Sequence, residues 1–242
     1  MKTSRMLQVT VAGFCGLAVT LFGLASASFA QDEAVAQGVT IGQVIGDGGT
    51  IGFVILGTSI LSVALIIEHF VSIRRDKLAP PQVIDEIESL FEEENYQESL
   101  ELCEAEPSYL TNVVAAALPR INAGFTAMEQ SLQEMGEEEA VKLHQKIGWL
   151  SLIGSIAPML GLLGTVLGMM ESFNVIAAKK GAADPSDLAS GISKALVTTF
   201  LGLFVAIPSM IGFFFFRSRV IKLVLEIGAV TEQLFDKFRP HE

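Results

Sequence analysis

The chain has 242 residues, of which 50% are hydrophobic, and a formal net charge of -11 at pH 7. Its mean hydropathy of +0.51 is too high for an ordinary soluble domain, so membrane-spanning segments are expected. The charge is local, because sixteen acidic and only four basic residues lie between Asp76 and Lys146. Such an acidic, water-exposed block argues against nucleic-acid binding, which needs clustered lysine and arginine.

The first 30 residues have the layout of a secretory signal peptide. Lys2 and Arg5 precede an apolar run, and small residues then allow cleavage after Ala27 or Ala30. The run is shorter than the about 20 residues that a spanning helix needs. This length favours removal of the segment over its retention as an extra span.

Three later stretches are long and apolar enough to cross about 30 Å of hydrocarbon. They cover residues 51–73, 147–173 and 191–216. Clusters of lysine and arginine follow the first and third stretches and precede the second, so the positive-inside rule places these ends in the cytoplasm. The sequence therefore predicts an all-α membrane protein with three transmembrane helices, its N-terminus outside and its C-terminus inside.

This topology assigns the remaining segments to the two sides of the membrane. Residues 31–50, which contain no lysine or arginine, and the loop 174–190 are expected in the periplasm. Residues 74–146 form an acidic cytoplasmic domain, whose apolar residues recur at helical spacing. Residues 217–242 form a cytoplasmic C-terminal helix, and its apolar stripe favours packing against another helix. The second span is thus preceded by a long helical extension that starts near residue 125, and the third span is followed by one that forms the C-terminal helix.

Residues typical of catalysis and metal binding do not gather in this sequence. His69, His144 and His241 are isolated, and neither a phosphate-binding loop nor a Gly-x-Ser-x-Gly motif is present. Cys15 belongs to the leader, and Cys103 is expected to be buried and unreactive. We therefore expect no enzyme activity, no metal and no cofactor.

Small residues recur along the second and third spans. Gly161, Gly164 and Gly168 in the second span and Gly202 in the third belong to small-x-x-x-small patterns. In lipid, such patterns indicate close approach of helix backbones. The first span is richer in bulky aliphatic residues and is expected to face lipid more.

Two long motifs give the chain a specific resemblance. APMLGLLGTVLGMMESF (157–173) and DPSDLASGISKALVTTFLGLFVAIPSM (184–210) resemble the second-span and third-span motifs of the ExbB/TolQ/MotA proton-channel family. GGTIGFVILGTSILSVALIIEHF (48–70) is similar to the family's first span, with His69 where Arg more commonly follows the Glu. A single cytoplasmic loop after the first of three spans favours the ExbB/TolQ branch over MotA, whose members carry a fourth span.

The resemblance implies a multi-pass subunit of the bacterial inner membrane. It implies a homopentamer around single-span partners of the ExbD/TolR type, which couples proton or sodium motive force to mechanical work in energised outer-membrane transport or envelope maintenance. Thr165 and Thr199 match the motif threonines and are implied to line the ion path, where a hydroxyl can orient water. The alternative is that each hydroxyl bonds a carbonyl one turn earlier and only permits packing.

Lys194 departs from the family pattern, because ExbB and TolQ proteins often have Glu at this position. Helix lengths of about 35 Å and 37 Å from the basic ends of the spans place Lys194 and Glu171 near the outer rim. We expect Lys194 to be a fixed charge at the outer pore mouth, within reach of Glu171. Two alternatives stay open: Lys194 pairs with the partner's membrane Asp and locks the motor, or the chain is a non-conducting scaffold. A secondary transporter is disfavoured, since three spans without an internal repeat do not build an alternating-access core.

Overall fold

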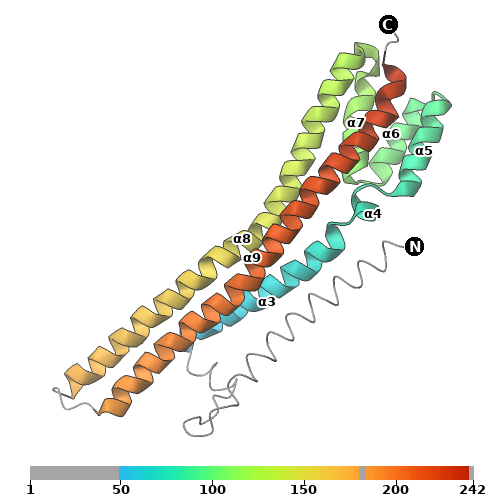
Figure 1. Ribbon diagram of the computed structural model, residues 1–242. Helices are drawn as coiled ribbons and strands as arrows, with labels where there is room; N and C mark the ends of the chain where they lie inside the picture. Colours follow the sequence, from blue (N-terminus) through green and yellow to red (C-terminus); the bar gives the residue numbers. More distant parts are fainter. Residues whose placement is uncertain (1–48, 180–183, 240–242) are drawn as a thin grey trace. The chain divides into compact units, whose positions relative to one another are not determined.

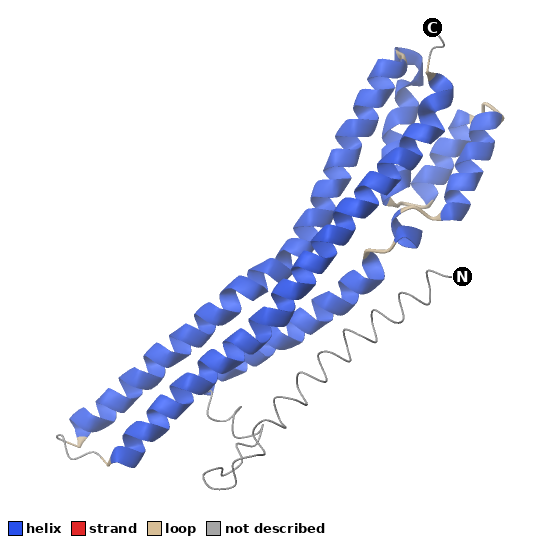
Figure 2. Ribbon diagram, in the orientation of Figure 1, coloured by secondary structure: helices blue, strands red, loops and turns tan. Residues whose placement is uncertain are grey.

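The computed structural model describes residues 49–179 and 184–239, and these residues form helices joined by short connections (Figures 1 and 2). The predicted signal peptide, with both cleavage sites, and nearly all of the predicted periplasmic segment 31–50 lie outside the described residues. The helices are α3 (Gly49–Ser72), α4 (Arg75–Leu78), α5 (Pro81–Glu92), α6 (Tyr96–Ala105), α7 (Tyr109–Ala117), η1 (Leu118–Ala123), α8 (Phe125–Ala178), α9 (Pro185–Phe235) and η2 (Asp236–Phe238).

Local sequence signals explain where these helices begin. Pro81 is the first residue of α5, where its missing N–H leaves no helical bond unmade. Ser108 and Thr111 form a capping box at the start of α7. Gly124, which precedes α8, has a φ of 97°, a conformation that L side chains rarely adopt.

Two very long helices dominate the described part of the chain. α8 has 54 residues and α9 has 51, which correspond to about 81 Å and 77 Å at 1.5 Å per residue. They run antiparallel and side by side (Figure 1). The prediction that a polar helix starting near Phe125 continues into the second span is confirmed, and the third span likewise continues into the C-terminal segment.

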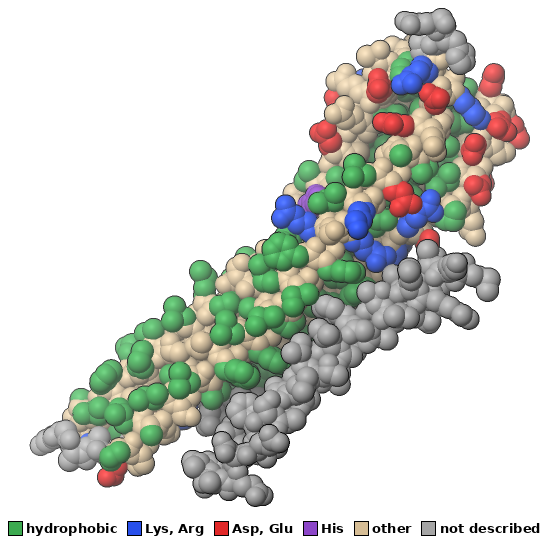
Figure 3. All heavy atoms as spheres, in the orientation of Figure 1, with side chains coloured by type: hydrophobic (Ala, Val, Ile, Leu, Met, Phe, Trp, Pro, Cys, Tyr) green, Lys and Arg blue, Asp and Glu red, His purple; other side chains and the backbone are tan. Residues whose placement is uncertain are grey.

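Three helices, α3, α8 and α9, are long and apolar enough to cross a membrane. Only 17% of the most apolar window of α3 is buried within the chain, against 33% in each of the other two. The first span is thus the more exposed, as its bulky composition predicted. Figure 3 shows hydrophobic side chains over one part of the α8–α9 pair and acidic side chains gathered over the other. The three-span, all-α prediction is therefore confirmed.

Polar contacts fix α3 against the two long helices. The hydroxyls of Ser62 and Ser209 are 2.7 Å apart and join α3 to α9. Glu68 Oε1 lies 2.8 Å from Lys146 Nζ of α8. This ion pair joins the last turns of α3 to α8.

Each of the two arginines after α3 has a different partner. Arg74 Nε donates to the carbonyl of Phe70, and Arg75 Nε lies 2.6 Å from Glu226 Oε1 of α9. These arginines therefore tie the end of α3 and the start of α4 to neighbouring backbone and to α9.

The remaining helices form an acidic bundle, which we define as α5, α6, α7, η1 and the adjoining parts of α8 and α9. Phe91 is at its centre, with ring centroids 5.5 Å from Phe235 and 6.0 Å from Tyr96. Cys103 is buried here, and this burial raises the pKa of its thiol to about 11, which agrees with an unreactive cysteine. The C-terminal apolar stripe packs against other helices of the same chain, through Val220, Leu223, Ile227 and Leu234.

Candidate functional site

The second and third spans touch through small residues. A Cβ added at Gly202 would lie 2.5 Å from the carbonyl oxygen of Ala157. A Cβ added at Gly161 would lie 3.0 Å from Thr199 Cα. Only glycine therefore allows the two backbones to come so close, as the small-residue patterns predicted.

The same contact continues along both helices. A Cβ added at Gly164 would collide with the side chain of Thr198, and one added at Gly168 would lie 3.0 Å from Ala195 Cβ. The four glycines that we predicted as packing residues thus lie in one contact between α8 and α9 of the same chain. We call this contact the glycine seam; it comprises Ala157, Gly161, Gly164 and Gly168 of α8 and Ala195, Thr198 and Gly202 of α9.

The two candidate threonines make different hydrogen bonds. Thr199 Oγ1 donates across the seam to the Gly161 carbonyl, at 3.2 Å. Thr165 Oγ1 donates to the carbonyl of Leu162 in its own helix, at 2.6 Å. The packing alternative therefore describes the bond of Thr165, whereas Thr199 links the two spans. Both side chains are half-buried in the single chain.

Thr198 is a polar seam residue that sequence reasoning missed. Its side chain is 4% exposed, and its hydroxyl donates to the Ala195 carbonyl at 2.8 Å, with the Gly161 carbonyl at 3.4 Å. Adjacent residues point about 100° apart on a helix, yet both Thr198 and Thr199 have their hydroxyls near the Gly161 carbonyl of α8. Of the two, Thr198 is the one whose side chain packs on Gly164.

Polar residues continue from the threonines along the spans. On α8, Ser151 and Ser155 are one turn apart, and Thr165 lies close to four turns beyond Ser151. On α9, Thr199 and Arg217 are five full turns apart and so share one face. We call these five residues, together with His144, the polar line.

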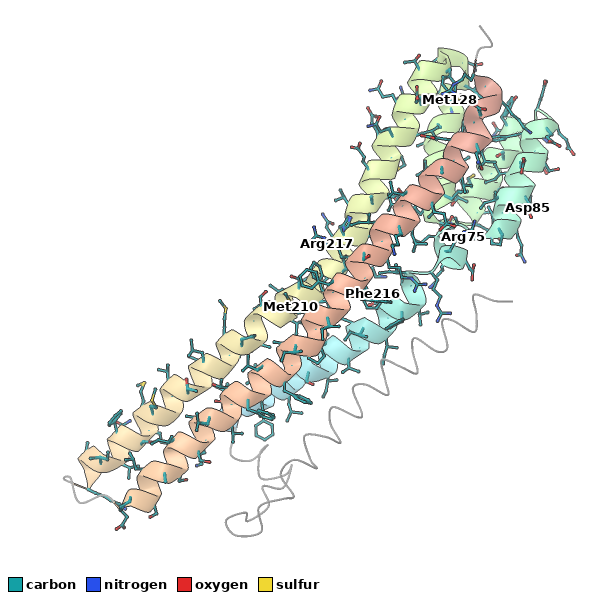
Figure 4. All side chains as sticks on the ribbon, viewed as in Figure 1. Arg75, Asp85, Met128, Met210, Phe216 and Arg217 are labelled. Atoms are coloured by element: carbon teal, nitrogen blue, oxygen red, sulfur yellow. The ribbon has the colours of Figure 1, made fainter. Side chains whose placement is uncertain are left out.

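The polar line ends in an open groove of about 690 Å³ between α8 and α9. Arg217 is marked in Figure 4, two turns beyond Met210, whose side chain covers Gly154. Hydroxyls, an imidazole and a guanidinium here share a groove with apolar walls, and can hold water or an anion. The groove is lined by His144, Ile147, Gly148, Ser151, Leu152, Ser155, Phe213, Arg217 and Ile221.

Lys194 and Glu171 lie near the opposite end of the α8–α9 pair. A Cβ added at Gly191 would collide with Ser172, and Gly168 faces Ala195, so this register sets Lys194 and Glu171 within about one turn of each other in height. Lys194 is half-buried and Glu171 is exposed. Within residues 49–179 and 184–239, no ion pair joins them.

No group of three or more His, Cys, Asp or Glu side chains that could hold a metal ion occurs in the described ranges. The chemistry available along the two spans is that of hydroxyls, backbone carbonyls and a few fixed charges.

Three helices that are long and apolar enough to cross a membrane, two of them joined by the glycine seam, define a polytopic membrane protein. The model of the MotA/TolQ/ExbB proton channel family matches residues 104–228, more than half of the chain. The chain belongs to this family.

Several curated relatives agree with this assignment. An ExbB-like protein of Synechocystis sp. is 30% identical over 188 residues, which are 77% of this chain and 90% of that protein. Biopolymer transport protein exbB1 of Vibrio cholerae is 43% identical over 76 residues, 31% of this chain and 33% of the relative. Tol-Pal system protein TolQ of Pseudomonas aeruginosa is 42% identical over 83 residues, 34% of this chain and 35% of the relative. The ExbB/TolQ branch predicted from the motifs is thus represented among the relatives.

Proposed function

We propose that this chain is an inner-membrane stator subunit that conducts protons, or sodium ions, together with a single-span partner of the ExbD/TolR type. Ion flow through this complex would be coupled to mechanical work in energised outer-membrane transport or envelope maintenance. The observation that carries the proposal is the polar line, because hydroxyls along the two spans are groups that can solvate an ion or a partner carboxyl within a membrane.

The hydrogen bonds of the threonines fit this role in different ways. The Thr199 hydroxyl donates to Gly161, and its oxygen still has lone pairs with which to accept from water or from a protonated carboxyl. Thr165 keeps the same accepting capacity while it bonds Leu162. Both therefore provide acceptors at the depth where the partner helix would carry its acid.

The surface outside the glycine seam supports assembly as a homopentamer. Within the spans, many large apolar side chains remain exposed in the single chain, among them Met159, Leu162, Leu196 and Phe200. Part of this surface faces lipid, and part of it would pack against neighbouring copies. Because the glycine seam is already used within each chain, we assign the contacts between copies to these bulkier faces.

The proposed orientation has the acidic bundle in the cytoplasm and the loop 174–190 in the periplasm, since the basic clusters lie at the ends of the spans next to the bundle. Lys194 and Glu171 would then stand at the outer pore mouth, where a charge costs less than at the bilayer centre. A cysteine in place of Ala177 should react with an impermeant thiol reagent in intact cells, and one in place of Ser89 should not. The opposite pattern would overturn the orientation.

Ion flux into proteoliposomes tests the proposed function directly. Vesicles that contain this chain and an ExbD/TolR-type partner from the same genome should acidify under an imposed potential, and vesicles with either protein alone should not. Stable complexes without flux would instead identify the non-conducting scaffold. Lys194→Met would then separate two causes: restored flux would show that Lys194 locks the path, and continued absence of flux would exclude this lock.

A further inference from the structure

Lysine and arginine side chains gather where the apolar spans meet the acidic bundle (Figure 3). Two of these cations are neutralised by carboxylates of the chain itself. Arg75 Nε lies 2.6 Å from Glu226 Oε1, and Lys146 Nζ lies 2.8 Å from Glu68 Oε1. Both carboxylates are therefore already used, and they do not compensate the other cations at this level.

Arg219 of α9 carries a charge that the described residues leave uncompensated. The side chain is half-buried, its Nε is buried without a hydrogen-bond partner, and no carboxylate of residues 49–179 and 184–239 pairs with it. Burial lowers the pKa of its guanidinium, and the nearby charge of Arg74 lowers it further. Arginine stays protonated in proteins, so these two like charges remain close together. A buried donor without an acceptor beside a second cation is the arrangement that a bound anion explains.

Arg74, just beyond the end of α3, has the chemistry to bind the same anion. It is exposed, and its Nε donates to the Phe70 carbonyl at 2.9 Å. This bond leaves the two terminal nitrogens of the guanidinium without a partner among the described residues. Guanidinium groups bind phosphate oxygens through paired, charge-assisted hydrogen bonds. Arg74 and Arg219 thus offer a phosphate one guanidinium from each of two neighbouring elements.

The surface on the span side of these two arginines is apolar. Phe70 and Phe215 lie one turn before Arg74 and Arg219 respectively, and their ring centroids are 5.7 Å apart. Val71, beside Phe70 on α3, is 51% exposed, and Phe215 is 37% exposed. A free phosphate would use only the arginines. A phospholipid would also cover this apolar surface with its acyl chains, so the position of the two arginines favours a lipid.

We propose that Arg74 and Arg219 bind the phosphate of an anionic phospholipid, whose acyl chains lie against the Phe70–Phe215 pair. The lipid compensates the charge of Arg219 and links the end of the first span to α9. In the proposed orientation it belongs to the inner leaflet. Arg219 points about 200° away from Arg217 of the polar line on α9, so the lipid site is separate from that line and does not depend on ion conduction.

Tryptophan fluorescence can report on this site alone, because the chain has a single tryptophan. Trp149→Phe removes it, and Phe215→Trp then places one beside the arginines. The full chain is placed in bilayers of phosphatidylcholine and phosphatidylglycerol, in which one of the two lipids carries brominated acyl chains that quench tryptophan. Brominated phosphatidylglycerol should quench more strongly than brominated phosphatidylcholine at the same mole fraction. Equal quenching by the two lipids would overturn the proposal.

Variants in the same background test whether the two arginines cause this preference. Arg219→Gln and Arg74→Gln should each lower the relative binding constant for phosphatidylglycerol by about fivefold. Arg120→Gln is the matched control and should leave the preference unchanged, because residues 125–146 of α8, about 33 Å of helix, separate η1 from the second span. A preference that survives in both Arg219→Gln and Arg74→Gln would overturn the site.

Inorganic phosphate distinguishes a lipid site from a site for a free anion. Added at constant ionic strength, it should not relieve the quenching by brominated phosphatidylglycerol, because it cannot replace the contacts of the acyl chains. Relief of quenching by phosphate, but not by chloride, would assign the two arginines to a free anion and overturn the lipid assignment.

Discussion

α8 and α9 pack against each other in two different ways along their length. In the spans the contact is the glycine seam, where Gly202 meets the Ala157 backbone and large side chains point outward. In the acidic bundle the contacts are instead made by large buried side chains such as Phe235 and Ile227. Lipid is as apolar as leucine, so helices associate there by close backbone approach, whereas in water the burial of apolar surface drives packing. The same two helices thus pack by close backbone approach in the spans and by burial of large apolar side chains in the acidic bundle.

The largest loss of stability should come from truncating the aromatic core of the bundle. Phe91 is 5% exposed and contacts Tyr96, Phe235 and Phe238. Phe91→Ala should destabilise the bundle by about 3–5 kcal/mol, through lost burial and the cavity left behind. Denaturant unfolding followed by hydrogen exchange of α5 and α6 measures this. Phe173→Ala, at a span position that is 66% exposed, is the matched control and should leave bundle unfolding unchanged.

Cys103 reports how tightly this bundle is closed. With a thiol pKa of about 11 instead of 9.0, the thiolate fraction at pH 8 is about a hundredfold lower than for an ordinary cysteine. In a Cys15→Ala chain, Cys103 should therefore react with alkylating reagents at least about a hundredfold more slowly than a cysteine at exposed Ser89. Equal rates in the folded protein would contradict a closed core.

The raised pKa of Cys103 also predicts how bundle stability depends on pH. The thiol keeps its proton more strongly in the folded chain than in the unfolded chain, so its contribution is complete below about pH 9. The contribution is then lost as pH rises towards about 11. A Cys103→Ala chain should lose less stability over this range. Denaturant melts at several pH values measure the difference.

A smaller loss is expected from one methyl group in the glycine seam. The Cβ of Gly202→Ala would press on the Ala157 carbonyl, which is backbone and cannot rotate away, and should cost about 1–3 kcal/mol. Gly57→Ala in α3, where nothing lies within 4 Å, is the control and should not destabilise. Unfolding in mixed detergent micelles would compare the two. Equal stability of both variants would show that the seam is not closely packed.

The smallest effect should come from the ion pair between α4 and α9. Arg75 and Glu226 are about half exposed, so Arg75→Gln should cost only about 0.2–1 kcal/mol, and less in high salt. Lys222→Gln removes an exposed cation from α9 as the matched control. A loss well above 1 kcal/mol for Arg75→Gln would mean that this pair is shielded from water in the assembled protein.

The features that the sequence predicted correctly are those with local signals. Apolar length marked the three spans, and the small-residue patterns that contain Gly161 and Gly202 marked close packing. The ion pair between Glu68 and Lys146 has no local signal in the sequence, because it depends on how α8 lies against α3. The role of Thr198 was missed because helical spacing alone does not say that both of the adjacent threonines contact α8.

Proton flux through threonine variants tests the central claim, that the polar line carries the ion. Thr→Val keeps nearly the same shape and removes the hydroxyl. Thr165→Val and Thr199→Val should each assemble with the partner and lower flux in proteoliposomes by about tenfold or more, which corresponds to about 1.4 kcal/mol. Thr198→Val, one residue away with its hydroxyl bonded to Ala195, is the matched control and should keep most of the flux. Full flux in both polar-line variants, or an equal loss in Thr198→Val, would contradict the account.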